Sequence, residues 1–138
     1  MDENKIKFLE MIQGIITRMA SNSFLLKGWA VTLVAGMFFL SAREANSIFF
    51  LIAYVPVILF WFLDAYYLQL ERKYRVLYND TVESLADKVN FKLSIKKSNA
   101  QEKTMFMQSL MSPTEFLFYF PMAFLVALVV IVALCANR

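Results

Sequence analysis

The stretch that decides the fold is Phe116–Ala136, FLFYFPMAFLVALVVIVALCA, which contains no charged residue. A helix needs about 20 consecutive apolar residues to cross a bilayer, and this stretch meets that length outright. Two apolar runs precede it, Phe24–Ala42 and Ser47–Leu63. These runs also reach the required length if Lys27 and Asp64 lie near a membrane surface. The sequence therefore predicts three transmembrane helices.

The composition supports a membrane protein and excludes several classes of function. The 138 residues are 59% hydrophobic and 18% charged, whereas soluble proteins are about 45–50% apolar and about 25% charged. There is no histidine and only one cysteine, Cys135, so the usual general base and any cysteine-based metal cluster are missing. We therefore predict an integral membrane protein that is not an enzyme and that uses no metal ion or cofactor.

The distribution of basic residues predicts the orientation. Twelve of the 14 Lys and Arg residues lie in the segment up to Lys27 or between the second and third apolar runs. Basic residues are retained on the cytoplasmic side of a membrane. The prediction is a multi-pass protein of the bacterial inner membrane, with a cytoplasmic N-terminus, a tight outer turn at residues 43–46 and a periplasmic C-terminus.

The polar segments are expected to be mostly helical. Phe8, Ile12 and Ile16 recur at helical spacing, which predicts an N-terminal amphipathic helix that lies on the inner membrane surface or packs on the cytoplasmic segment. The second span is expected to continue as a helix beyond the membrane. Asp80 with Glu83 resembles a capping box, which predicts a helix boundary there.

Three further local patterns lie between the second and third spans. Residues 90–97 alternate apolar and polar side chains, which favours a short strand. Residues 98–100 are predicted to form a turn before a short amphipathic helix. Ser112-Pro113-Thr114-Glu115 is typical of a helix start, with Glu115 as the capping partner.

Together these patterns predict an all-α membrane protein, and a pore formed by it would require a homo-oligomer. Its predicted segments are an N-terminal amphipathic helix (1–23), a transmembrane hairpin (24–69), a small and mostly helical basic cytoplasmic segment (70–112) and a third transmembrane helix (113–138).

Lys27 and Asp64 lie at similar depth in the predicted hairpin, counted from its turn, and Trp29 and Trp61 match each other one turn deeper. The two tryptophans suggest an aromatic belt at the inner interface. Lys27 either extends to the lipid headgroups or forms an ion pair with Asp64 that ties the two helices together.

Small residues are concentrated on one face of the first span. Gly28, Thr32 and Gly36 are four residues apart, and small residues at this spacing allow close helix packing. This face either packs within a three-helix bundle or forms a subunit interface or pore lining. In a pore, Phe38 and Phe39 are candidates for a hydrophobic constriction.

The basic cytoplasmic segment has two interpretations. It is retained by the anionic inner leaflet, or it binds a nucleotide or single-stranded oligonucleotide, with lysines on phosphates and Phe91 stacked on a base. The candidate ligand-binding residues are Arg72, Lys73, Arg75, Lys88, Phe91, Lys92, Lys96 and Lys97.

Residues 22–36, NSFLLKGWAVTLVAG, and 60–80, FWFLDAYYLQLERKYRVLYND, resemble a widespread family of small bacterial inner-membrane proteins. Some proteins of this kind are membrane effectors of anti-phage defence that are paired with a nucleotidyltransferase. In the Hailong type, DNA oligomers hold a channel-like effector shut. The resemblance implies a homo-oligomeric, channel-like effector and a neighbour-encoded signalling enzyme as its partner. It carries no catalytic residues.

The sequence is also compatible with a different class of protein. The chain would then be a membrane anchor or adaptor that holds a soluble partner through its amphipathic helices and conducts nothing.

Overall fold

A computed structural model describes residues 3–44, 51–83 and 99–136. These residues form four helices, namely α1 (Glu3–Glu44), α3 (Tyr54–Glu83), α4 (Asn99–Leu110) and α5 (Pro113–Ala136). No strand occurs in the described ranges, and the all-α prediction is confirmed. The predicted strand at residues 90–97 lies outside the described residues.

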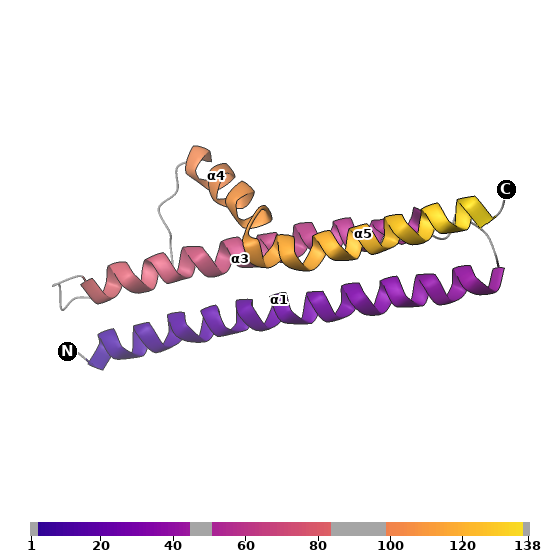
Figure 1. The fold of residues 1–138 in the computed structure, drawn as a ribbon. Helices are drawn as coiled ribbons and strands as arrows, with labels where there is room; N and C mark the ends of the chain where they lie inside the picture. Colours follow the sequence, from indigo (N-terminus) through magenta and orange to yellow (C-terminus); the bar gives the residue numbers. More distant parts are fainter. Residues whose placement is uncertain (1–2, 45–50, 84–98, 137–138) are drawn as a thin grey trace.

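The molecule is long and narrow (Figure 1). Helices α1 and α3 run antiparallel and side by side, and α1 alone is about 63 Å long at 1.5 Å per residue. Helix α5 lies beside α3 and the C-terminal half of α1, whereas α4 branches away from α3. The chain is therefore three helices thick at one end and two helices thick at the other.

Helices α1 and α3 are longer than the local sequence signals indicate. The predicted N-terminal helix continues without a break into the first apolar run, and α1 also includes the first two residues of the predicted outer turn. The helix boundary predicted at Asp80 is wrong, because α3 continues to Glu83. Thr81 is buried, and its Oγ1 donates to the Leu77 carbonyl at 2.7 Å. The turn predicted at residues 98–100 is also wrong at its end, since α4 begins at Asn99.

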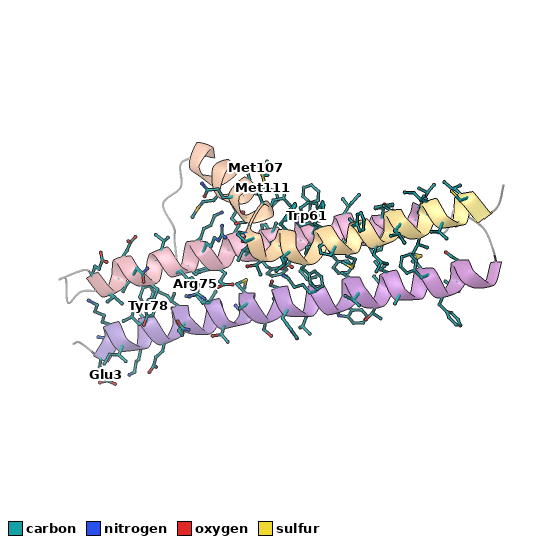
Figure 2. The ribbon with its side chains drawn as sticks, viewed as in Figure 1. Glu3, Trp61, Arg75, Tyr78, Met107 and Met111 are labelled. Atoms are coloured by element: carbon teal, nitrogen blue, oxygen red, sulfur yellow. The ribbon has the colours of Figure 1, made fainter. Side chains whose placement is uncertain are left out.

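The two-helix end has its own apolar core. Phe8, Ile12 and Ile16 of α1 are buried against Tyr74 and neighbouring aromatic and aliphatic side chains of α3. Tyr78 lies on the side of α3 that faces α1 (Figure 2). The N-terminal amphipathic helix thus packs on the extension of the second span. We call this part, residues 3–22 with residues 66–83, the stalk.

Replacing Ile12 by alanine is expected to destabilise the stalk by about 2–4 kcal/mol, because a fully buried isoleucine is lost and a cavity remains. Amide hydrogen exchange in residues 3–22 would measure this as faster opening. Ile6→Ala is the matched control, since Ile6 is 42% exposed on the same helix. Equal exchange in the two variants would contradict the packing described here.

The three-helix end buries little of its apolar surface. Its core contains Ala30, Val34, Val57 and Tyr119, while large apolar side chains such as Phe24 and Leu117 are more than three-quarters exposed. Soluble monomers rarely expose apolar patches of this extent. We call this part, residues 23–44, 51–65 and 113–136, the apolar half.

Among the described residues, two helices are long and apolar enough to cross a membrane, over Glu3–Ser41 and Pro113–Cys135. The most apolar part of each is only 11% buried. The crossing predicted at Ser47–Leu63 lies partly outside the described residues and stays a prediction.

Candidate functional site

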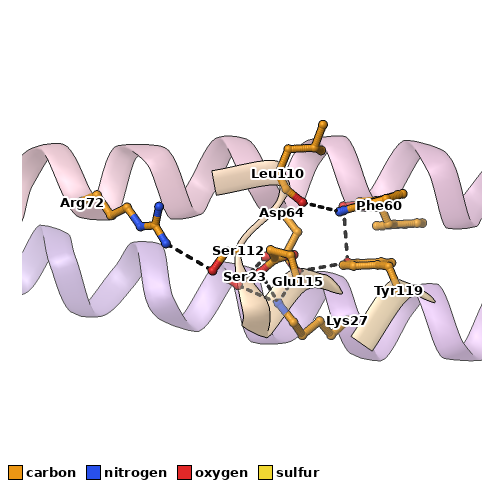
Figure 3. A network of polar contacts seen from close by, with 10 residues as sticks. Ser23, Lys27, Phe60, Asp64, Arg72, Leu110, Ser112, Glu115 and Tyr119 are labelled. Carbon is orange, nitrogen blue, oxygen red and sulfur yellow. Dashed lines mark hydrogen bonds and ion pairs between the residues drawn. The ribbon is translucent and has the colours of Figure 1, made fainter. Parts of the chain in front are cut away.

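A cluster of charged and polar side chains lies where the stalk meets the apolar half (Figure 3). All three long helices contribute to it. Helix α1 supplies Ser23 and Lys27, α3 supplies Asp64, and α5 supplies Glu115 and Tyr119. We call these five residues the charged cluster.

Lys27 is at the centre of the cluster. Its Nζ donates to Asp64 Oδ2, to Glu115 Oε1 at 3.0 Å and to Ser23 Oγ at 3.2 Å. Asp64 also accepts hydrogen bonds from Ser23 Oγ and, at 3.1 Å, from the Tyr119 hydroxyl. The Asp64 and Glu115 side chains are 0% and 1% exposed, against 16% for Lys27. One ammonium group is therefore shared by two carboxyl groups that are withdrawn from solvent.

Helical spacing explains how the sequence forms this cluster. Ser23 and Lys27 are four residues apart on α1, and Glu115 and Tyr119 are four residues apart on α5, so each pair lies on one helix face. Asp64 is followed by Ala65, which is fully buried and is small enough to let a neighbouring helix approach. The pair Lys27–Asp64, which the sequence places at similar depth, is in direct contact.

The charges of the cluster do not balance when each group has its usual charge at neutral pH. Lys27 carries one positive charge, whereas Asp64 and Glu115 together carry two negative charges. Glu115 Oε2 is buried and has no hydrogen-bond partner, and the Glu115 and Asp64 carboxyl groups both contact the Lys27 ammonium group. Two ionised carboxylates cannot bond to each other, because both are acceptors only.

The cluster lies at one end of the apolar half. From Lys27 to the end of α1 at Glu44 is about 26 Å, and from Glu115 to the end of α5 at Ala136 is about 32 Å, at 1.5 Å per residue. Both lengths are close to the roughly 30 Å hydrocarbon thickness of a bilayer. The cluster can therefore clamp three helices at the level of a membrane surface.

A second set of contacts holds the corner between α4 and α5 against α3. Trp61 Nε1 donates to the Leu110 carbonyl at 3.1 Å, and the Trp61 ring stacks on Tyr119 with centroids 6.2 Å apart. Arg72 donates to Ser109 Oγ at 3.4 Å and to Ser112 Oγ at 3.2 Å. Through Tyr119, this corner is joined to the charged cluster.

Replacing Arg72 by alanine is expected to release the α4–α5 corner, because a cation that bonds two hydroxyl groups is lost. We expect the free energy of opening this corner to fall by about 1–2 kcal/mol, so that amide exchange in α4 becomes roughly tenfold faster. Arg75→Ala is the control, since Arg75 forms an exposed pair with Glu71 at 2.8 Å and such pairs contribute little. Unchanged α4 exchange in Arg72→Ala would argue against the corner contacts.

The candidate ligand-binding residues do not form one surface in the described residues. Arg72 is directed to the α4–α5 corner, Lys73 is only 4% exposed, and Arg75 is exposed beside Glu71. The other five candidates, Lys88, Phe91, Lys92, Lys96 and Lys97, lie outside the described residues.

The small-residue face of α1 is uncovered. Gly28, Thr32 and Gly36 are all exposed, and a Cβ atom placed on either glycine meets nothing within 4 Å. Among the described residues, nothing packs on this face, and its role as a subunit interface or pore lining stays a prediction. Phe38 packs against the core of the apolar half, whereas Phe39 is 65% exposed.

No family model, curated protein or solved structure matches this chain. The resemblance of residues 22–36 and 60–80, with the defence role and signalling partner that it implies, stays a prediction. A functional proposal for this chain therefore depends mainly on its own geometry.

The prediction for one site residue needs correction. The Glu115 side chain is not a capping partner, because its Oε1 contacts Lys27 and its Oε2 contacts no donor. Trp61 donates to the Leu110 carbonyl at the α4–α5 corner, whereas Trp29 is 59% exposed, and the aromatic belt stays a prediction. The i, i+4 spacing of Glu115 and Tyr119 was the available signal for a polar site on α5.

Proposed function

We propose that this chain is a channel-like membrane effector that works as a homo-oligomer in the bacterial inner membrane. It opens a path through the membrane when a cytoplasmic nucleotide or oligonucleotide signal changes. The observation that carries the proposal is the uncovered small-residue face of α1. A role in anti-phage defence is proposed from the sequence resemblance alone.

The two faces of α1 support assembly with further copies. Ala30 and Val34 are buried in the core of the apolar half, while Gly28, Thr32 and Gly36 are exposed and a Cβ atom on either glycine meets nothing within 4 Å. Small residues let membrane helices approach closely enough for extensive van der Waals contact. Three helices are too few to enclose a path of useful width, so a path requires several copies, with α1 at their interface.

The charged cluster supports control from the cytoplasmic side. A ligand on the basic segment between α3 and α4 acts on α4, whose corner with α5 is held by Arg72 and Trp61. Glu115 lies in the first turn of α5 and contacts Lys27. Movement of the corner therefore reaches α1 through this ion pair.

The distribution of basic residues supports the proposed topology. The stalk and the basic segment are cytoplasmic, three helices cross the membrane, and the C-terminus is periplasmic. The charged cluster then lies at the cytoplasmic surface of the hydrocarbon, where Lys27 reaches the headgroup region.

Ion flux from proteoliposomes tests the proposal. Purified protein is reconstituted in vesicles loaded with potassium, and efflux is followed with and without single-stranded DNA oligonucleotides or mononucleotides. We expect a flux whose rate changes with one of these ligands and which is lost in Gly36→Leu. An oligomeric protein that gives no flux under any of these conditions would contradict it.

A non-conducting membrane anchor or adaptor is the second candidate, and the stalk is the feature that favours it. The stalk has a closed apolar core of its own and offers two long helices for a soluble partner. A monomer that co-purifies with a neighbour-encoded protein, and that conducts nothing, would support the anchor instead.

A further inference from the structure

We propose that the charged cluster is a proton-binding site, in which Glu115 takes up and releases one proton. The ligand is a proton from water, and binding forms one O–H bond on the Glu115 carboxyl group. This inference does not rest on the proposed function, because it concerns the occupancy of the cluster and holds whether or not the protein conducts ions.

The charge of the cluster favours one bound proton. In the described part of the chain, Lys27 is the cation in contact with both Asp64 and Glu115, and both carboxyl groups are at most 1% exposed. With both ionised, the cluster has an uncompensated negative charge on groups withdrawn from solvent, which is costly. One bound proton makes the cluster neutral.

One oxygen atom of Glu115 has no hydrogen-bond partner. Glu115 Oε1 accepts from Lys27, whereas the buried Oε2 accepts from nothing. The Asp64 carboxylate contacts the same ammonium group, so the two carboxyl groups are neighbours. A proton on Glu115 turns one of two neighbouring acceptors into a donor, which is how adjacent carboxyl groups share one proton.

A proton fits this site better than a metal ion does. Metal cations that bind carboxylates, such as calcium and magnesium, take about six oxygen ligands, whereas Asp64 already accepts bonds from Ser23, Lys27 and Tyr119. Within the described part of the chain, no group of three or more Asp, Glu, His or Cys residues is arranged to hold a metal.

Proton release is expected to loosen α5. The titratable groups that face Glu115 are Lys27 from α1, Asp64 from α3 and Tyr119 from its own helix. Loss of the proton places a second negative charge beside Asp64, which repels the first turn of α5 from α3. The folded state is then more stable at low pH and loses this stability as the pH rises.

Infrared spectroscopy of the full-length protein in lipid nanodiscs tests the site directly. The wild type is expected to show the carbonyl band of a protonated carboxyl group, and this band should decrease reversibly as the pH is raised. The band is expected to be missing in Glu115→Gln and unchanged in Glu10→Gln, the control, since Glu10 is exposed on α1.

Thermal unfolding provides the second measurement. Across the pH range in which the infrared band disappears, the wild-type midpoint should fall by about 4 °C or more, whereas that of Glu115→Gln should stay level. Glutamine is neutral and similar in shape, so it imitates the protonated form.

Four results would overturn the proposal. The wild type shows no protonated carboxyl band above the pH at which exposed carboxyl groups have ionised, a result that does not depend on the folding of any variant. The band disappears in Asp64→Asn but not in Glu115→Gln. Glu115→Gln has the pH profile of the wild type. Finally, sodium chloride stabilises the wild type relative to choline chloride at constant pH, which would assign a metal cation instead.

Discussion

Replacing Lys27 by methionine is expected to lower the free energy of unfolding by about 3–5 kcal/mol, the cost of removing one partner from a buried ion pair. Methionine keeps the length of the side chain but leaves Asp64 and Glu115 without their shared cation. Unfolding of the protein in mild detergent, followed by circular dichroism, measures the loss.

The chain offers a matched control for this substitution. Lys7 forms an exposed ion pair with Glu3 at 2.7 Å on the same helix, and Lys7→Met is expected to change stability by no more than about 0.5 kcal/mol. Neutralising the carboxyl groups as well, with Asp64→Asn and Glu115→Gln, should recover much of the stability lost in Lys27→Met. The importance of the cluster would be refuted if Lys27→Met were no less stable than Lys7→Met.

Replacing Gly28 or Gly36 by leucine is expected to weaken oligomerisation at least tenfold, about 1.4 kcal/mol or more, without unfolding the chain. The bulky side chain separates helices at the proposed interface, whereas nothing within the single chain lies within 4 Å of the new Cβ atom. Cross-linking and mass photometry in nanodiscs measure the subunit number, and circular dichroism measures the fold.

Ala30→Leu is the contrasting variant on the same helix. Ala30 is fully buried within the chain, so the same bulk should cost about 1–3 kcal/mol of folding stability through overpacking. Wild-type protein that is monomeric in a bilayer, or glycine variants that assemble as the wild type does, would contradict the proposed role of the small-residue face.

The features of the fold that the sequence could predict are those with local or regular signals. The uninterrupted apolar run at Phe116–Ala136 is sufficient to predict α5, and the helical spacing of Phe8, Ile12 and Ile16 predicts the buried face of the stalk. The contact between Lys27 and Asp64 could also be predicted, because the two residues lie at similar depth when counted from the predicted turn.

The rest of the cluster depends on contacts that no local pattern records. Glu115 lies 88 residues from Lys27 in the sequence. The residues Ser112-Pro113-Thr114-Glu115 are already explained as the start of a helix, so no local pattern indicates the contact with Lys27. The same reason explains the wrong boundary at Asp80, where a capping signal is overridden by packing of α3 on α1. The sequence around Trp61 is typical of a tryptophan at a membrane interface. Its hydrogen bond to the Leu110 carbonyl is apparent only from the position of α4.

Thiol labelling in intact bacteria tests the central claim most directly, namely that the apolar half crosses the membrane and the stalk lies inside the cell. The chain has one cysteine, Cys135, which is exposed near the end of α5. Glu10→Cys in a Cys135→Ala background provides a reporter in the stalk.

A membrane-impermeant maleimide is predicted to label Cys135 once the outer membrane is opened, and to label the stalk cysteine only after the inner membrane is also permeabilised. Labelling of the stalk cysteine while the inner membrane is intact would contradict the proposed arrangement, as would a protein that stays in the soluble fraction without detergent.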